Sequence, residues 1–102
     1  MERRSIDFAA VNAAALRSLF PILQRWLPDG RLQGQEWVSR NPTRADRHAG
    51  SFSVNLRTGR WADFSTGDRG GDPVSLTAYL CGCSQVEAAR RVAAMLGMEA
   101  RP

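Results

Sequence analysis

The sequence contains no lysine, one histidine and only two cysteines in 102 residues. Cys81 and Cys83 are one residue apart, a spacing that rarely allows a disulfide between the two, so we expect reduced thiols that are buried or half-buried. No apolar run approaches the length of a membrane span, and the N-terminal residues do not resemble a secretory signal. These absences predict a cytoplasmic protein that has no membrane partner.

All 14 basic residues are arginine, and the formal net charge is +4. Arginine forms bidentate contacts with phosphate and stacks on bases, so this composition suits a nucleic-acid partner. The simpler alternative is a basic surface that only keeps the protein in solution.

A chain of this length, with 43% hydrophobic residues, is expected to form a single domain over its whole length. Apolar residues at helical spacing predict an N-terminal helical element over 8–28, with Asp7 as its N-cap. Pro21 lies inside this stretch. We therefore expect either one bent helix or two short helices that divide after Leu19 or Phe20.

Residues 31–72 are predicted to form an antiparallel sheet followed by a glycine-rich loop. A first strand is expected over 31–40, with Gly34 as a candidate bulge. A hairpin follows, in which the strand 52–56 alternates apolar and polar residues and a turn leads into the strand 61–64. The apolar residues of that alternation are expected to face the core.

Two short helices are predicted over 73–97. Asp72, followed by a proline, is a suitable N-cap for the first helix, which should end at Gly82. Ser84 begins a capping-box sequence for the second helix, and Gly97 follows its expected end. The elements together predict an α+β fold: a small sheet of three to four antiparallel strands packed with an N-terminal helix and two C-terminal helices.

The segment from Gly59 to Leu76 is not explained by the needs of a core alone. A short aromatic strand runs into a loop with three glycines, two aspartates and one arginine in six residues, and this loop leads directly to a helix start. A glycine-rich backbone with free N–H groups, beside a cation and a helix N-terminus, is typical of a site for phosphate or another anion.

The order of these segments resembles the N-terminal zinc-ribbon domain of bacterial, phage and plasmid DNA primases. In that family a Cys-Pro-x-His pair precedes a Pro-Ser-Phe-x-Val strand, an aromatic-x-Cys-x-x-Cys-Gly segment follows, and Gly-Gly-Asp leads into a helix. The corresponding segments here, in the same order, are Asn41-Pro42-Thr43-Arg44, Gly50-Ser51-Phe52-Ser53-Val54, Trp61-Ala62-Asp63-Phe64 and Gly70-Gly71-Asp72. The resemblance covers residues 37–97.

The metal ligands of that family are missing from this chain. Asn41 and Arg44 take the places of the first Cys and the His, while Asp63 and Thr66 lie near the places of the second pair. Zinc needs about four Cys, His or carboxylate ligands, whereas this segment offers one carboxylate and the imidazole of His48, which we expect on the surface. The sequence thus predicts no zinc, and a polar corner in which Asp63 pairs with Arg44.

Other interactions must then replace the stability that zinc would provide. The N-terminal helix and three tryptophans are the available substitutes, because each tryptophan can bury a large apolar area and a helix across one face of the sheet would complete a core. The tryptophans are Trp26, Trp37 and Trp61.

The resemblance implies a non-catalytic, nucleic-acid-binding module of a primase or replication system in a phage, plasmid or other bacterial mobile element. Its partners would be single-stranded DNA template and a separate primase or helicase protein. The candidate contacts are arginines, one aromatic residue and the glycine loop: Arg40, Arg44, Arg47, Arg57, Arg60, Trp61, Arg69, Gly70 and Gly71. Arg90 and Arg91 are expected on the solvated side of the last helix.

The alternative is a protein-interaction module that lost both zinc and DNA binding and now docks on a replication protein. An exposed apolar strip on the last helix, or an acidic face around the glycine loop, would favour it. An enzyme is the weakest hypothesis, because Asp63 and Asp68 have no His, Ser or Cys placed as a catalytic partner. We therefore predict no catalytic residue and no cofactor.

Overall fold

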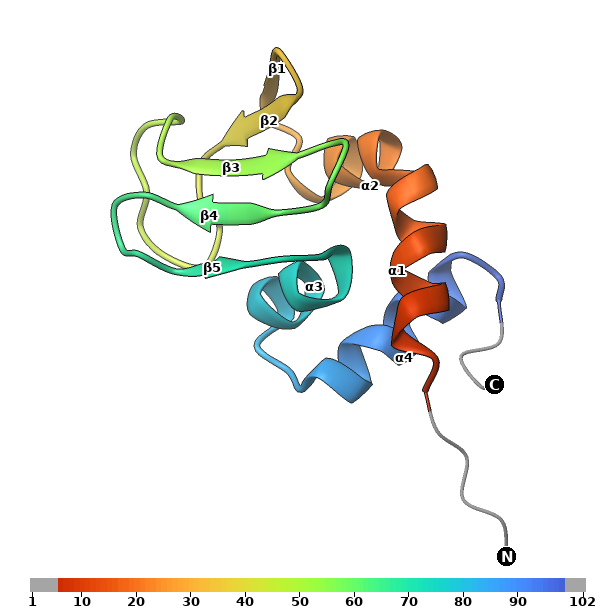
Figure 1. Cartoon of the computed structure of the whole chain (residues 1–102). Coiled ribbons are helices and arrows are strands. Elements are labelled where there is room, and N and C mark those ends of the chain that lie inside the picture. The colour runs from red at the N-terminus through yellow and green to blue at the C-terminus, as the bar shows by residue number, and fades with distance from the viewer. Residues whose placement is uncertain (1–5, 99–102) are drawn as a thin grey trace, which may run out of the picture.

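The computed structural model describes residues 6–98 and contains an α+β fold. In chain order the elements are α1 (Phe8–Arg17), α2 (Leu19–Trp26), β1 (Arg31–Gln33), β2 (Glu36–Ser39), β3 (Phe52–Asn55), β4 (Trp61–Asp63), β5 (Arg69–Gly70), α3 (Pro73–Cys81) and α4 (Gln85–Met95). The strands form one antiparallel sheet in the order β1-β2-β3-β4-β5, and the helices gather beside it (Figure 1). The predicted fold class is confirmed, but the sheet has five strands instead of three to four.

One additional strand arises where a bulge was predicted. Gly34 has φ +62° and lies in a two-residue turn, with Gln33 paired opposite Glu36. Glycine at the first central position is what such a hairpin turn favours. The expected single strand over 31–40 is therefore the hairpin β1–β2.

The other additional strand lies inside the predicted glycine loop. Arg69 pairs with Ala62, and Gly70 pairs with Trp61, so that β5 extends the sheet beyond β4. Two of the six residues of the glycine-rich segment are thus fixed by strand pairing.

The N-terminal helical element consists of two helices that divide at Ser18, just before the predicted positions. Asp7 caps α1 as predicted, because its Oδ1 accepts the N–H of Ala10 at 3.0 Å. Pro21 is the third residue of α2. In the first turn of a helix a proline removes no helical hydrogen bond, and so Pro21 does not break or kink α2.

Both C-terminal helices begin and end where the sequence predicts. Asp72 accepts the N–H of Ser75 at 2.8 Å, and Ser84 accepts the N–H of Glu87 at 3.1 Å. Gly82 ends α3 with φ +66°, a left-handed conformation that costs glycine little.

Two apolar clusters hold the fold together. The first joins the helices and consists of Val11, Ala15, Ile22, Val74, Ala78, Ala88, Ala89, Val92 and Ala93. The second lies where α2 packs across one face of the sheet and contains Leu19, Leu23, Leu27, Trp37, Phe52, Val54, Trp61 and Leu76. The predicted inward face of β3 and the packing of the N-terminal helical element on the sheet are confirmed. Trp37 and Trp61 are buried, while Trp26 is half-buried.

The cysteines and the histidine lie at the surface or near it. Both thiols are free; Cys83 is half-buried as expected, but Cys81, the last residue of α3, is exposed. His48 is exposed in the connector between β2 and β3, as expected. Across residues 6–98, no helix combines the length and the apolar character needed to cross a membrane.

Candidate nucleic-acid interface

Asn41, Arg44 and Asp63 form a hydrogen-bonded polar corner. Asp63 is fully buried, and its Oδ2 accepts from Arg44 Nε and from Asn41 Nδ2, each at 2.8 Å. Its Oδ1 accepts from Arg44 Nη2 at 3.3 Å and from the Ser65 N–H at 2.9 Å. The predicted pairing of Asp63 with Arg44 is confirmed.

The electrostatics of this corner are those of a satisfied ion pair. The bond from Arg44 holds the pKa of the Asp63 carboxyl well below its usual range, with Asn41 and Ser65 adding to the effect and burial opposing it. The same bond raises the pKa of Arg44, whose Nη2 also lies 3.4 Å from Asp46. Arg44, a predicted phosphate contact, is therefore committed to the fold.

The corner offers no set of metal ligands. Within the part of the chain that the structure describes, no three His, Cys, Asp or Glu side chains could hold an ion together. Every buried side-chain polar atom of that part has a hydrogen-bond partner. Hydrogen bonds and an ion pair thus occupy the corner completely.

The predicted anion site at the start of α3 is not available. The Val74 N–H donates to Asn12 Oδ1 at 2.9 Å, the Ser75 N–H donates to Asp72, and Pro73 has no N–H to offer. A helix N-terminus binds an anion through free amides, and the amides of this first turn are already bonded. The start of α3 therefore offers no free amide to an anion, whereas phosphate binding by the glycine loop itself stays a prediction.

Gly70 and Trp61 have packing roles where contacts with nucleic acid were predicted. A Cβ on Gly70 would collide with the Trp61 indole and with the Ser75 hydroxyl, so only glycine fits at this position. Trp61 is only 5% exposed, and its Nε1 donates to Ser75 Oγ at 3.0 Å. Its ring faces the core and is not free to stack on a base.

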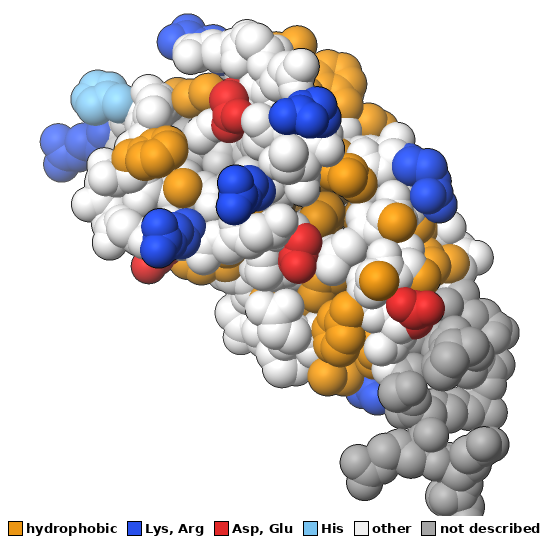
Figure 2. Space-filling view, viewed as in Figure 1, with side chains coloured by type: hydrophobic (Ala, Val, Ile, Leu, Met, Phe, Trp, Pro, Cys, Tyr) orange, Lys and Arg blue, Asp and Glu red, His pale blue; other side chains and the backbone are white. Residues whose placement is uncertain are grey.

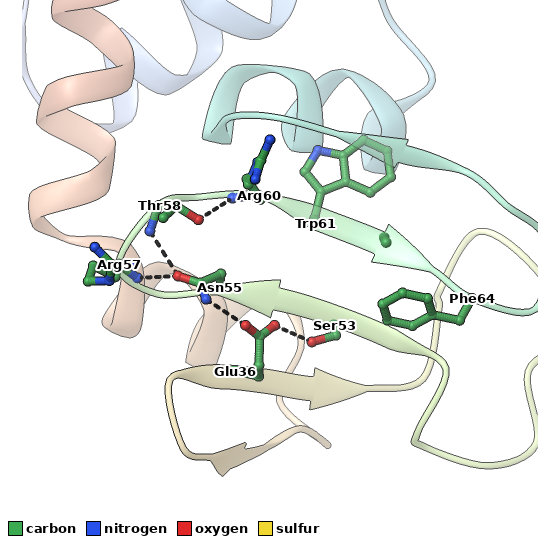
Figure 3. A pocket seen from close by; sticks show the side chains of 9 residues that line it. Glu36, Ser53, Asn55, Arg57, Thr58, Arg60, Trp61 and Phe64 are labelled. Atoms are coloured by element: carbon green, nitrogen blue, oxygen red, sulfur yellow. Dashed lines mark hydrogen bonds between the residues drawn. The ribbon is translucent and has the colours of Figure 1, made fainter.

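The face of the sheet turned away from α2 carries two adjoining hollows. The first, of about 350 Å³, is lined by Glu36, Ser53, Asn55, Arg57, Thr58, Arg60, Trp61, Ala62 and Phe64 (Figure 3). The second, of about 670 Å³, continues along β4 and β5 and is lined by Arg60, Trp61, Ala62, Phe64, Arg69, Gly70 and Gly71. The shared residues make the two hollows one open surface, which we call the outer face.

Three predicted arginines meet on the outer face. Arg57, Arg60 and Arg69 are exposed, and none forms an ion pair or a side-chain hydrogen bond with any other residue in 6–98. Pairing of the strands aligns a further row across this face: Arg31, Val38, Ser53, Ala62 and Arg69. Figure 2 shows arginine side chains spread over the strand half of the molecule, among exposed hydrophobic atoms and scattered acidic groups.

The remaining predicted contacts lie outside this surface. Arg40 is 3.4 Å from Asp29 in an exposed ion pair, and Arg47 is exposed in the connector. Arg90 and Arg91 are exposed on α4, as expected, and Arg91 is paired with Glu87. The structure therefore brings together the arginines of the β3–β4 turn and of β5, but not those of the connector.

Phe64 provides the exposed aromatic ring that Trp61 does not. Its side chain is 77% exposed, and its N–H donates to the carbonyl of Ser51 at 2.8 Å, which fixes the backbone at the end of β4. Alternation along the strand explains why Phe64 is exposed and Trp61 is not, because residues 61 and 63 face the core while 62 and 64 face outward. Arginines beside an exposed aromatic ring are the combination by which single-strand binders hold backbone and bases.

Glu36 was not among the predicted site residues, yet it lines the first hollow from its β2 side. It accepts a hydrogen bond from Ser53 Oγ on one oxygen and from Asn55 Nδ2, at 2.6 Å, on the other. Figure 3 shows its carboxylate pointing from β2 toward these residues of β3. Glu36 lies within the predicted strand 31–40, but only the pairing of β2 with β3 sets it opposite Asn55.

Comparison with protein-family models and with curated proteins gives no match for this chain. The resemblance to primase zinc ribbons consequently stays a prediction drawn from the residues themselves.

Proposed function

We propose that this chain is a non-catalytic module that binds single-stranded DNA in a primase or other replication system. The observation that carries the proposal is the outer face, where Arg57, Arg60 and Arg69 border an open surface beside the exposed ring of Phe64. Arginine can contact phosphate wherever it lies along a strand, and an aromatic ring can stack on any base.

The shape of the outer face favours a single strand over a duplex. The row of paired residues across it has arginine at both ends, Arg31 on β1 and Arg69 on β5, which are four strand spacings, or about 19 Å, apart. A single strand laid along this row can turn its bases toward Phe64, whereas a duplex keeps its bases stacked inside.

The assignment to a replication system rests on the resemblance to primase ribbons. The polar corner gives it physical support, because Asn41, Arg44 and Asp63 come from segments far apart in the chain and meet as a ligand set would. In this proposal the module presents template to a polymerising domain on a partner primase or helicase protein.

The proposal is tested by fluorescence anisotropy with one labelled oligonucleotide, as a single strand and as a duplex, at two salt concentrations. We expect the single strand to bind more tightly, with a slope of log affinity against log salt of about −2 for three phosphate contacts. Absence of binding at low salt, or tighter binding of the duplex, would overturn the proposal. The metal content of the same sample shows whether binding occurs without zinc.

A docking role on a replication protein is the second candidate. The exposed large apolar residues of α4 are Val86 and Met95. They are nine positions apart and so lie on opposite sides of the helix, which means that they form no apolar strip for docking. The observation that favours docking is a hollow of about 230 Å³ lined mainly by Trp26, Pro42 and Leu80. Pro42→Arg would block this hollow at an exposed position. It should abolish binding to the replication protein and leave DNA binding unchanged if docking is a separate function.

A further inference from the structure

The first hollow combines one anion, Glu36, with two cations, Arg57 and Arg60. Glu36 is the one acidic side chain among the residues that line the two hollows of the outer face. It forms no ion pair with Arg57 or Arg60, although both border the same hollow. A carboxylate beside a phosphate-binding surface weakens binding of the backbone, so its presence needs another explanation.

The carboxylate of Glu36 is held in a fixed orientation. Asn55 is itself fixed, since its Oδ1 accepts the N–H groups of Arg57 and Thr58 at 2.9 Å each and its Nδ2 donates to Glu36. Ser53 donates to the other oxygen of Glu36. Each carboxylate oxygen can accept about two hydrogen bonds, and each oxygen of Glu36 receives one from β3, so each can accept one more.

Two adjacent acceptors in a fixed geometry select a partner that has two adjacent donors. Among the DNA bases, only guanine has neighbouring donors on its Watson–Crick edge, the N1–H and the N2 amino group. Adenine and cytosine pair one donor with an acceptor, and thymine has its single N–H between two carbonyls. Charge-assisted bidentate hydrogen bonds are among the strongest polar contacts in proteins, and an unmatched acceptor facing the carboxylate is repelled.

We propose that the first hollow binds one guanine of the single strand, with Glu36 accepting from its N1–H and N2 amino group and Phe64 stacking on its ring. This inference rests on the proposed function. The volume of about 350 Å³ lies at the small end of the range for ligand sites, which suits one base. Phe64 lies at one end of the hollow and Arg57 at the other, so ring and phosphate can be contacted together (Figure 3).

The test compares three thymidine 12-mers that differ at one central position, which carries deoxyguanosine, deoxyinosine or thymidine. Deoxyinosine keeps the N1–H of guanine and lacks only the amino group. We expect the guanine strand to bind roughly tenfold more tightly than the thymidine strand, with the inosine strand close to thymidine. Glu36→Gln should bind all three within twofold, because the amide offers one acceptor and no charge.

Glu87→Gln is the matched control, since it removes the same charge from a half-buried residue of α4, away from the outer face. It should keep the preference for guanine. Equal binding of the three strands by the unchanged protein, or a preference that survives Glu36→Gln, would overturn the base assignment while leaving the proposed function intact. Failure of all three strands to bind at low salt would overturn both.

Discussion

Arg44 and Asp63 form a two-point ion pair across the polar corner, with Nε to Oδ2 at 2.8 Å and Nη2 to Oδ1 at 3.3 Å. The Asp63 carboxylate is fully buried, while the Arg44 side chain is 30% exposed. The pair therefore links the connector to the end of β4. Because the carboxylate is buried, water cannot take the place of the Arg44 nitrogens as its hydrogen-bond donors.

Asp63→Asn should destabilise the fold strongly. The substitution keeps the size of the side chain but turns an NH₂ group toward donors, and the hydrogen bonds of Arg44 lose their charged acceptor. We expect the free energy of unfolding to fall by about 2 to 3 kcal/mol. Urea unfolding followed by tryptophan fluorescence measures this. Asp29→Asn, which breaks the exposed pair with Arg40, should leave the midpoint unchanged.

The stability of the fold should depend on pH because of the Asp63 carboxyl. Its folded pKa lies well below its usual range, so the unfolded chain binds this proton first and the stabilisation is fully present only above about pH 5. As the pH falls through about 4 toward the folded pKa, this contribution should be lost. Unfolding midpoints measured from pH 6 to pH 3 should fall more steeply for the unchanged protein than for Asp63→Asn. Parallel curves would contradict the assignment.

Gly70→Ala should destabilise the sheet, and Gly71→Ala should not. The added methyl at Gly70 meets the Trp61 indole and Ser75, which leave no room, whereas a methyl at Gly71 meets no atom within 4 Å. Overpacking of this kind costs roughly 1 to 3 kcal/mol. Thermal unfolding of the two variants side by side makes the comparison. Equal loss of stability in both variants would indicate that both positions need the backbone conformations of glycine and not the space of a missing side chain.

Alanine at Arg57, Arg60 and Arg69 together should weaken single-strand binding by a similar factor for every sequence. Phosphate contacts do not read bases, and removal of three of them should flatten the salt dependence by about 2 in slope. Anisotropy titrations at several salt concentrations measure both quantities. The matched control is the double change Arg90→Ala and Arg91→Ala on α4, whose equal effect would place the binding surface elsewhere.

Phe64→Ala should reduce affinity for single strands and leave the fold intact. Its ring is 77% exposed and contributes little to the core, while base stacking of this kind is worth roughly 1 to 3 kcal/mol. A loss of about tenfold in affinity, with an unchanged unfolding midpoint, is the expected result. Val86→Ala, an exposed apolar truncation on α4, should change neither.

The sequence predicts best the features that depend on neighbours a few positions apart. The caps at Asp7, Asp72 and Ser84 are local hydrogen bonds, so residue type and spacing suffice to find them. The pairing of Asp63 with Arg44 spans 19 positions, and it was found through the resemblance, which aligned the two segments.

The features that were missed depend on contacts made only in the folded chain. A run of glycines favours a loop, but Gly70 is a strand residue because the Trp61 indole needs the space of a side chain. The exposed aromatic was misassigned for a similar reason. Alternation places Trp61 and Phe64 on opposite faces, and only the packing of the helices decides which face is covered.

The second apolar cluster sets a limit on how the outer face can be moved to another protein. Leu19 and Leu23 of α2, with its C-cap residue Leu27, supply the layer beneath the strands, and without them Trp37 and Phe52 would be exposed to water. A graft of residues 31–72 alone onto a foreign scaffold would therefore collapse or aggregate. A graft that includes α2 and α3 with the strands would keep the apolar face of the sheet covered. The smallest fragment that can be grafted with this surface therefore includes helices that take no part in binding.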